Sequence, residues 1–214
     1  MNKLRVGICG WGNVATGLFK TLQTNSVEIK KRSNLEIEII AIGARRDNPK
    51  CDPGNVTIER DIFKVIDHDI DVVVELIGGV DVARDLILKA LNAKKHVVTA
   101  NKAVIFNHGN ELFSVANKNG VKLLYESSVC AGTPIIKLLN QELAASKISK
   151  ISGMLNGTSN FILSNMEEGM EFEPTLKLAQ EKGYAEPDPS FDIEGTDAAH
   201  KIGILSSLAF GSSL

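Results

Sequence analysis

Short apolar runs rich in β-branched residues alternate with longer stretches of helical period from residue 3 to about residue 125. This alternation is typical of successive βαβ units and predicts a mostly parallel sheet. The runs assigned to strands are Leu4–Cys9, Glu36–Gly43, Asp71–Ile77, Lys95–Thr99 and Val121–Tyr125. Helices are expected between them at Ala15–Gln23, Val82–Leu91 and Gly109–Lys118, the last of them ended by Gly120.

The pattern changes after residue 126. Apolar residues of helical period at 134–144 precede a strand-like segment, "KISKISGMLNG" at 147–157, and further helical pattern follows it. A loop rich in glycine, proline and acidic residues occupies 183–195, and a final helix is expected from about Thr196 to Phe210. We therefore predict an α/β protein of two domains, a parallel-sheet domain at residues 1–128 and a smaller α/β domain at residues 129–214.

A glycine-rich turn separates the first strand from the first helix, in "VGICGWGNVATGL" at 6–18. Gly10 suits the tight turn, Gly12 would let a pyrophosphate approach the backbone, and the small Ala15 allows close helix packing. Backbone N–H groups at the helix start favour an anion, so Asn13 and Val14 join the candidates. An ordinary turn is the alternative. The position between strand and helix favours a dinucleotide site, which makes residues 1–128 a Rossmann-type NAD(P)-binding domain.

Two arginines follow the second strand, in "AIGARRDN". No acidic residue stands at the strand end, where an NAD-selective site usually binds the ribose hydroxyls. Arg45 and Arg46 would instead bind a 2′-phosphate through charge-assisted hydrogen bonds. The alternative is a solvated loop in which Asp47 neutralises one arginine. The pattern favours NADP as cofactor, with NAD also possible.

The third strand ends at two glycines, in "DVVVELIGGVD" at 71–81. The carboxyl edge of a parallel sheet is where ligands bind, so Gly78 and Gly79 would let the backbone approach the cofactor. A flexible turn is the alternative. Glu75 stands inside this apolar run and needs a partner, which the sequence does not identify.

Composition narrows the classes of partner. The 214 residues are 43% hydrophobic and 23% charged, with a net charge of −2 and dispersed lysines, so we expect no binding to nucleic acid or to an anionic membrane. No apolar stretch approaches the ~20 residues of a membrane span. Small molecules and further copies of the chain are the expected partners. The three cysteines, Cys9, Cys51 and Cys130, show no disulfide or zinc spacing and fit a reducing cytoplasm.

Four further stretches go beyond dinucleotide binding. They are "TANKAV" at 99–104, "YESSVCAGTPI" at 125–135, "GMLNGTSNFI" at 153–162 and "EKGYAEPDPSFDIEGTDAAHKIGIL" at 181–205. Together with the glycine-rich turn and "ELIGG", they closely resemble homoserine dehydrogenase. The resemblance implies NAD(P)-dependent interconversion of L-homoserine and L-aspartate 4-semialdehyde, a step toward threonine, methionine and isoleucine.

The resemblance gives roles to two lysines. Asn101 and Lys102 follow a strand, where a lysine is more often a solvated helix-entry residue. The family pattern places Lys102 between nicotinamide and substrate, as a catalytic residue that orients the substrate, contacts the cofactor or exchanges a proton, with Asn101 beside it. Lys201 is the leading proton donor and Asp197 positions it. Their alternative is an i,i+4 surface ion pair worth only about 0.3–0.5 kcal/mol.

The resemblance also implies substrate contacts. Glu186 and Asp192 would hold the homoserine end, and Pro187 and Pro189 stiffen their loop. Further residues implied in the site are Asn156, Gly157 and Thr158 for substrate and Gly183 for cofactor. Good turn and helix-cap chemistry alone would also explain Asn156–Thr158, and we expect His200 to be a helix residue without a catalytic role.

The segment from Glu126 to Pro134 combines one carboxylate with small residues, so carbonyl oxygens can converge on a hard cation. The resemblance implies a sodium-like ion held by the Glu126 side chain and by backbone oxygens of Val129, Ala131 and Thr133. A hinge between domains is the simpler alternative, and Cys130 is interpreted as a packing residue.

Two rival functions remain at this point. One is another amino-acid or semialdehyde dehydrogenase of the same build, and the other is a non-catalytic nucleotide-binding subunit. The second domain shows one clear strand, around Lys147–Leu155, and an isolated strand cannot pair its backbone. We therefore expect either a homodimer that completes a sheet or a fragment of a longer protein with an incomplete substrate-binding and dimerisation domain.

Overall fold

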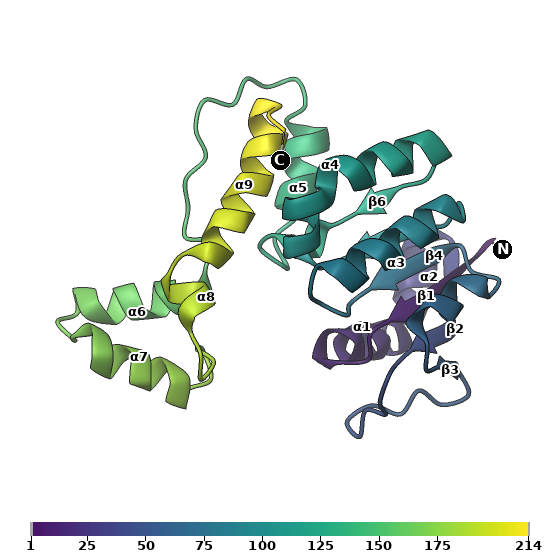
Figure 1. Ribbon diagram of the computed structural model, residues 1–214, viewed down its shortest axis with the longest axis horizontal. Helices are drawn as coiled ribbons and strands as arrows, with labels where there is room; N and C mark the ends of the chain where they lie inside the picture. The colour runs from purple at the N-terminus through teal and green to yellow at the C-terminus, as the bar shows by residue number, and fades with distance from the viewer. Residues whose placement is uncertain (1, 214) are drawn as a thin grey trace. The chain divides into compact units, whose positions relative to one another are not determined.

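The computed structural model describes residues 2–213, which divide into two compact units (Figure 1). The first unit extends to Ala131 and the second begins at Gly132. Each unit has its own arrangement of elements. None of the helices within residues 2–213 is long and apolar enough to cross a membrane.

A six-stranded parallel sheet forms the centre of the first unit, in the order β3-β2-β1-β4-β5-β6. The strands are β1 (Asn2–Cys9), β2 (Leu35–Gly43), β3 (Thr57–Glu59), β4 (Val72–Glu75), β5 (His96–Thr99) and β6 (Leu123–Leu124). The chain runs outward in one direction to β3 and then returns to start β4 beside β1. This is the doubly wound order of the Rossmann fold, so the predicted fold class is confirmed.

Helices cover the sheet, with bounds that differ from the predicted ones. They are α1 (Asn13–Thr24), α2 (Ser26–Ser33), η1 (Ile62–Asp67), α3 (Asp81–Asn92) and α4 (Lys102–Asn119). The last helix begins seven residues before the predicted Gly109, because Asn101 caps it by accepting a hydrogen bond from Val104 N at 3.2 Å. Gly120 ends it in the left-handed region, at φ 68°.

Local sequence pattern did not predict α2 and β3. The helix α2 has no buried residue, so it lacks the apolar stripe on which a helical prediction depends. The strand β3 is a three-residue edge strand that exists because it pairs with β2. The predicted third strand, Asp71–Ile77, is shorter in the structure because the backbone turns away after Glu75.

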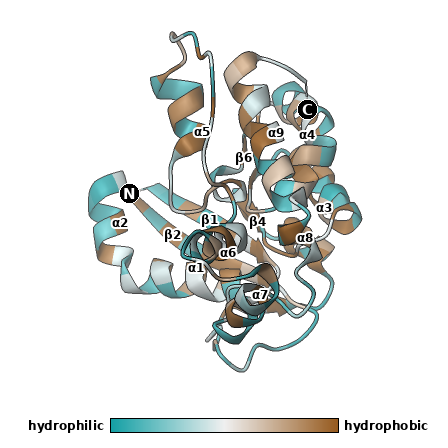
Figure 2. Ribbon diagram, turned by 90° about the vertical axis from the view of Figure 1, so that its left-hand side faces the viewer, coloured by the Kyte–Doolittle hydropathy of each residue, from teal (hydrophilic) through white to brown (hydrophobic). Residues whose placement is uncertain are grey.

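The core lies between the sheet and its helices. Ile8 on β1, Val73 on β4 and Ile42 on β2 are fully buried, and Leu86 of α3 and Leu112 of α4 are equally buried. In Figure 2 much of the ribbon around the labels β1 and β4 has the brown colour of hydrophobic residues. Burial of one such side chain contributes about 1.5–3 kcal/mol to the stability of the fold. A sheet with many of them is rigid enough to hold the turns at its edge in one conformation.

The second unit is helical. Its elements are α5 (Ile135–Lys137), the π-turn η3 (Leu138–Glu142), α6 (Gly157–Glu167), α7 (Phe172–Glu181), α8 (Ser190–Ile193) and α9 (Thr196–Phe210). The predicted strand around Lys147–Leu155 is wrong, since residues 147–156 have no regular structure. A strand needs a neighbour for its backbone groups, and residues 132–213 contain no strand.

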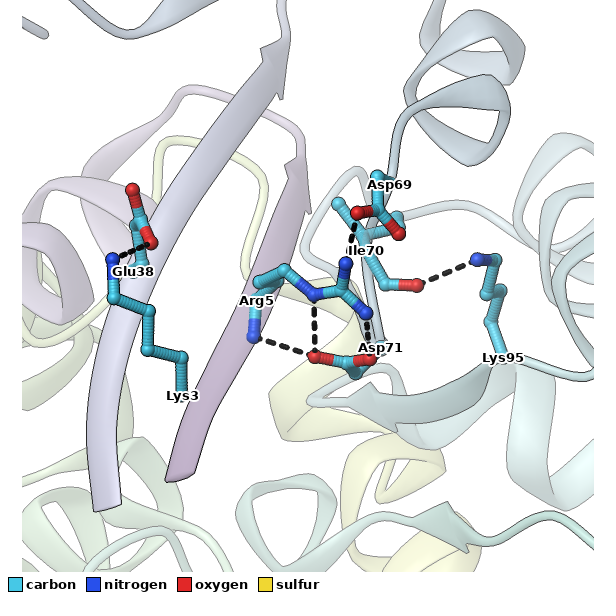
Figure 3. Close-up of polar contacts among 7 residues, drawn as sticks. All are labelled: Lys3, Arg5, Glu38, Asp69, Ile70, Asp71 and Lys95. Atoms are coloured by element: carbon cyan, nitrogen blue, oxygen red, sulfur yellow. Dashed lines mark hydrogen bonds and ion pairs between the residues drawn. The ribbon is translucent and has the colours of Figure 1, made fainter. Parts of the chain in front are cut away.

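A polar cluster fastens β1 to the start of β4 (Figure 3). Arg5 donates to Asp71 from its backbone N at 2.8 Å and from Nε at 3.1 Å and Nη2 at 2.7 Å, and it also pairs with Asp69. Nearby, Lys95 Nζ donates to Ile70 O at 2.6 Å. The hydrogen bonds from Arg5 lower the pKa of Asp71 to about 2. The cluster therefore favours an ionised Asp71 in the folded protein.

This lowered pKa predicts a pH dependence of stability. The pKa of Asp71 in the folded protein lies below the ordinary 3.8. The ionised side chain therefore contributes to the free energy of unfolding above about pH 4, and this contribution is lost as the pH falls toward 2. The Asp71 side chain is 31% exposed, and solvent screening limits the effect. We expect Asp71→Asn to lower the free energy of unfolding by about 1 kcal/mol at neutral pH, and by progressively less as the pH falls below about 4.

Urea unfolding of both proteins over a pH series measures this difference. Asp69→Asn is the control, because that side chain is 81% exposed. A difference that stays constant down to the acid end of the series would contradict the electrostatic explanation.

Candidate functional site

A cavity of about 1010 Å³ lies in the first unit, at the carboxyl edge of the sheet. Its walls come from the turn after β1, the segment after β2, η1 and the turn after β4. The sequence-predicted cofactor residues among its lining are Gly10, Gly12, Asn13, Arg45, Arg46, Gly78 and Gly79. The parallel sheet brings these segments together because all its strands end at one edge.

Glycine occupies positions 10 and 12 of the first turn for different physical reasons. Gly10 has φ +103°, and a Cβ there would lie 2.5 Å from Leu76 O, so the fold itself requires glycine. Gly12 has φ −95°, and a Cβ there would meet no atom within 4 Å. The fold therefore does not require glycine at position 12, and the free space suits a ligand that approaches the backbone.

The start of α1 suits an anion. Gly12 is the N-cap residue, no side chain caps the helix, and its first turn contains no acidic residue. The first backbone N–H groups of a helix carry partial positive charge and have no partners within the helix. The residues present thus fit the pyrophosphate of a dinucleotide.

Asp47 forms an ion pair with Arg60. Arg60 Nη2 donates to Asp47 Oδ1 at 2.6 Å, and Arg60 Nη1 donates to Ala44 O at 3.2 Å. Asp47 thus pairs with Arg60, which counts against the alternative that it neutralises Arg45 or Arg46. Sequence reasoning missed Arg60, which lines the same cavity, since only the short strand β3 brings it beside the end of β2.

Glu75 has the partners that the sequence did not identify. Its side chain is fully buried. Oε1 accepts hydrogen bonds from Ile77 N at 2.8 Å and Gly78 N at 3.4 Å, and Oε2 accepts one from Thr99 Oγ1 at 2.5 Å. Gly78 and Gly79 both have φ +73°, in the left-handed region, so this turn needs glycine for its conformation.

Asn101 joins this turn to α4. Its Nδ2 donates to Gly79 O at 2.6 Å, while its backbone N donates to Thr99 Oγ1 at 2.9 Å. Lys102, half-buried, is the first residue of the helix. Neither residue lines the cavity described above, and neither does Val14, which is 62% exposed.

The cysteines show no sign of catalytic chemistry. Cys9 and Cys51 are buried, Cys130 is half-buried, and all three are free thiols. Burial raises the pKa of the Cys9 thiol to about 12, and the charge of Glu75 adds to this effect. Cys9 is therefore protonated at neutral pH and is no nucleophile.

A second group of predicted residues meets in the second unit, around Asn156. This side chain caps α6, accepting from Ser159 N at 2.7 Å. Its Nδ2 donates to Asp192 Oδ1 at 2.7 Å and to Asp197 Oδ2 at 2.8 Å. Thr158 Oγ1 lies 2.6 Å from Tyr184 O and 3.0 Å from Asp192 Oδ2, so its single proton can serve either acceptor.

Lys201 completes this group. Its Nζ lies 2.7 Å from Asp197 Oδ2 and donates to Leu155 O, also at 2.7 Å. The side chains of Asp197 and Lys201 are only 6% and 18% exposed. The alternative of a surface ion pair is therefore wrong. Removal of one partner from a buried pair of this kind leaves the other charge buried and uncompensated, which is strongly destabilising.

The other predicted residues of this unit lie at its surface or in a packed contact. Glu186 and Gly183 are exposed, with Gly183 at φ +75°, and Gly157 begins α6. His200 lies edge-on to Phe191, with 5.7 Å between ring centroids. His200 is a residue of α9, as predicted, and its lack of a catalytic role stays a prediction.

The predicted cation ligands fall on both sides of the division between units. Glu126 begins a short 3-10 turn, η2 (Glu126–Ser128), and Val129 is fully buried. Ala131 ends the first unit, whereas Thr133 belongs to the second. Within residues 2–213 no group of three or more His, Cys, Asp or Glu side chains is placed to hold a metal. Backbone oxygens would supply three of the four ligands, so the cation stays a prediction.

Comparison with known proteins identifies the family. The family model for the homoserine dehydrogenase NAD binding domain matches residues 10–126, and the homoserine dehydrogenase model matches residues 134–214. Homoserine dehydrogenase of Pseudomonas aeruginosa is 52% identical over 100% of this chain, and that of Neisseria gonorrhoeae is 45% identical. The chain belongs to the homoserine dehydrogenase family.

Solved homoserine dehydrogenases share the fold. The Thiobacillus denitrificans enzyme superposes with a TM-score of 0.93 over 99% of this chain, at 45% identity. A hyperthermophilic archaeal homoserine dehydrogenase, solved in complex with NADPH, gives a TM-score of 0.85 over 98% of this chain and 70% of its own, at 28% identity. The chain spans about half the length of the curated relatives it matches.

The network around Asn156 predicts a stability effect. Asn156→Ala removes the cap of α6 and a donor to two carboxylates, one of them buried. We expect the free energy of unfolding to fall by about 2 kcal/mol, since a lost cap costs about 1 kcal/mol and an unsatisfied buried group about as much again.

Chemical denaturation measures this loss. Asn160→Ala, an exposed position of the same helix, is the control and should change stability by less than about 0.5 kcal/mol. Equal effects of the two substitutions would show that the network is not stabilising.

Proposed function

We propose that the protein to which this chain belongs catalyses the NAD(P)-dependent interconversion of L-homoserine and L-aspartate 4-semialdehyde. The observation that carries the proposal is the buried Asp197–Lys201 pair, in a family member that also has a dinucleotide-binding turn. The pair supplies a proton donor, and the cavity lined by Gly10 and Gly12 supplies a place for the cofactor.

Lys201 is assigned the proton transfer. Its ammonium group has three N–H bonds, of which one is donated to Asp197 and one to Leu155 O. The third is assigned to the substrate oxygen, which takes the proton as the aldehyde becomes an alcohol and returns it in the reverse direction. The bound nicotinamide supplies the hydride donor and acceptor for C4 of the substrate.

The remaining residues orient the reactants. Asp192 accepts from Asn156 and lies within reach of Thr158, so its carboxylate is held in place to receive the ammonium group of homoserine, together with Glu186. Gly157 would offer its backbone to the substrate and Gly183 to the cofactor. Asn101 and Lys102 at the start of α4 would contact cofactor and substrate, with Lys102 as a second candidate for proton exchange.

Arg45 and Arg46 support a preference for NADP over NAD. Both line the cofactor cavity, and the neighbouring carboxylate of Asp47 is paired with Arg60. A 2′-phosphate would thus meet two guanidinium groups, and the carboxylate that follows them in the chain is paired with Arg60. The NADPH complex of the archaeal homoserine dehydrogenase is consistent with this choice.

We also propose a bound cation, a homodimeric assembly and a cytoplasmic location. A sodium-like ion would bind Glu126 and the carbonyl oxygens of Val129, Ala131 and Thr133. The chain would form a homodimer with a second copy of itself. The free thiols suit a reducing cytoplasm, and the reaction places the protein in the synthesis of threonine, methionine and isoleucine.

A direct assay tests the proposed function. Homoserine-dependent reduction of NADP and of NAD is followed side by side in the purified protein, with other amino-alcohols as comparison substrates. We expect reduction with homoserine and a higher kcat/KM for NADP. Absence of homoserine-dependent reduction with either cofactor would refute the proposal.

Lys201→Ala tests the proton transfer. Loss of a general acid costs about two to four orders of magnitude in kcat, so we expect a fall of about 10²–10⁴ with little change in the Kd of NADPH. Lys177→Ala, an exposed lysine of α7, is the control. A kcat within a factor of two of the wild type in Lys201→Ala would exclude the assigned role.

The double substitution Arg45→Ala, Arg46→Ala tests cofactor choice. We expect NADPH binding to weaken by about 2–4 kcal/mol and NADH binding to stay nearly constant, because only NADPH carries the additional phosphate. Fluorescence titration gives both constants. Arg32→Ala on α2, 83% exposed, serves as a control for the loss of a surface arginine. Equal losses of affinity for NADPH and NADH would mean that the arginines do not bind the 2′-phosphate.

A further inference from the structure

A closed ring of polar contacts joins the two turns that follow β4 and β5. The carboxylate of Glu75 accepts from the backbone of the first turn and from Thr99. Thr99 Oγ1 accepts from Asn101 N, and Asn101 Nδ2 returns to Gly79 O. Glu75 and Thr99 are almost completely buried, whereas the hydrogen bond from Asn101 to Gly79 O lies at the surface.

A buried acid at this position needs a reason. An apolar side chain would pack against the same core without the cost of removing a carboxylate from water. The strand itself does not depend on Glu75, because β4 is hydrogen-bonded to β1 and β5 along its length and Arg5 fastens its other end. What the carboxylate holds is backbone beyond the strand.

Glu75 positions two segments of backbone, the turn after β4 and the start of α4. Ile77 and Gly78 donate to Oε1, which fixes the entry to a turn whose two glycines have positive φ. The other oxygen reaches α4 through Thr99 and Asn101, and Asn101 caps the helix that begins at Lys102. One carboxylate therefore sets the position of the glycine turn relative to the first turn of α4.

We propose that Glu75 is a positioning residue, which acts through Thr99 and Asn101 to hold the Gly78–Gly79 turn and Lys102 in the geometry needed for nicotinamide cofactor binding and turnover. The inference rests on the proposed function, which assigns cofactor contacts to this turn and to Lys102. Misplacement of such groups by a fraction of an ångström lowers both affinity and rate.

Two substitutions at Thr99 test the ring. Thr99→Val keeps the shape but removes the hydroxyl, which leaves Glu75 without one donor and Asn101 N without its acceptor. Thr99→Ser keeps the hydroxyl and should rescue. We expect Thr99→Val to raise the Kd of NADPH about tenfold and to lower kcat for homoserine about tenfold, whereas Thr99→Ser stays within about twofold of the wild type.

Glu75→Gln is the second variant, in case Thr99→Val does not fold. Its amide presents an NH2 group to one side of the ring, so it cannot accept from both Thr99 and the backbone of the turn. We expect a similar tenfold weakening of NADPH binding. Asp71→Asn is the matched control, because it weakens the opposite end of β4 and should lower stability without changing the Kd.

Amide hydrogen exchange without cofactor gives an independent measure. We expect the amides of Ile77, Gly78 and Asn101 to exchange about tenfold faster in Thr99→Val or Glu75→Gln than in the wild type. Unchanged exchange and unchanged Kd in these variants would overturn the inference, as would a Thr99→Ser protein as impaired as Thr99→Val. Failure of the proposed function would look different, since the wild type itself would then bind no NADPH or oxidise no homoserine.

Discussion

The uniform direction of the sheet is the constraint on which the first unit depends. Every strand pair from β3 to β6 is parallel, so the carboxyl ends of all strands reach the same edge. Residues as far apart in the chain as Gly12, Arg45 and Gly79 meet there around one cavity. The sheet can impose this because its central strands are buried on both faces, and a shift of register would expose their apolar side chains.

The two ends of β4 show how charge is used for different purposes in one fold. At the start, Asp71 lies partly in solvent and pairs with Arg5 in a bidentate contact, so its contribution is electrostatic and depends on pH. At the other end, Glu75 is fully buried and accepts hydrogen bonds from neutral donors. The first contact fastens two strands together, whereas the second determines where the backbone goes after the strand ends.

The second unit places its chemistry in a polar network. Asn156 joins two carboxylates, and Asp197 in turn holds Lys201. Desolvation makes a buried ion pair an inefficient way to stabilise a protein, but the same low exposure fixes the ammonium group in one position. A proton donor that is held in place before the substrate arrives costs less reorganisation during the reaction. The geometry therefore supports the proton transfer proposed for Lys201.

The sequence by itself determined what depends on short stretches of chain. The glycine-rich turn, five of the six strands and the i,i+4 spacing of Asp197 and Lys201 all follow from local pattern, as does the family resemblance. Only the tertiary structure decided the rest. It paired Asp47 with Arg60, Glu75 with Thr99 and Asn156 with Asp197, and it left residues 147–156 without a strand. Periodicity reports which face of an element is apolar, but the partner of a buried polar group or of a strand's backbone comes from another part of the chain, and only the packing of the whole brings the two together.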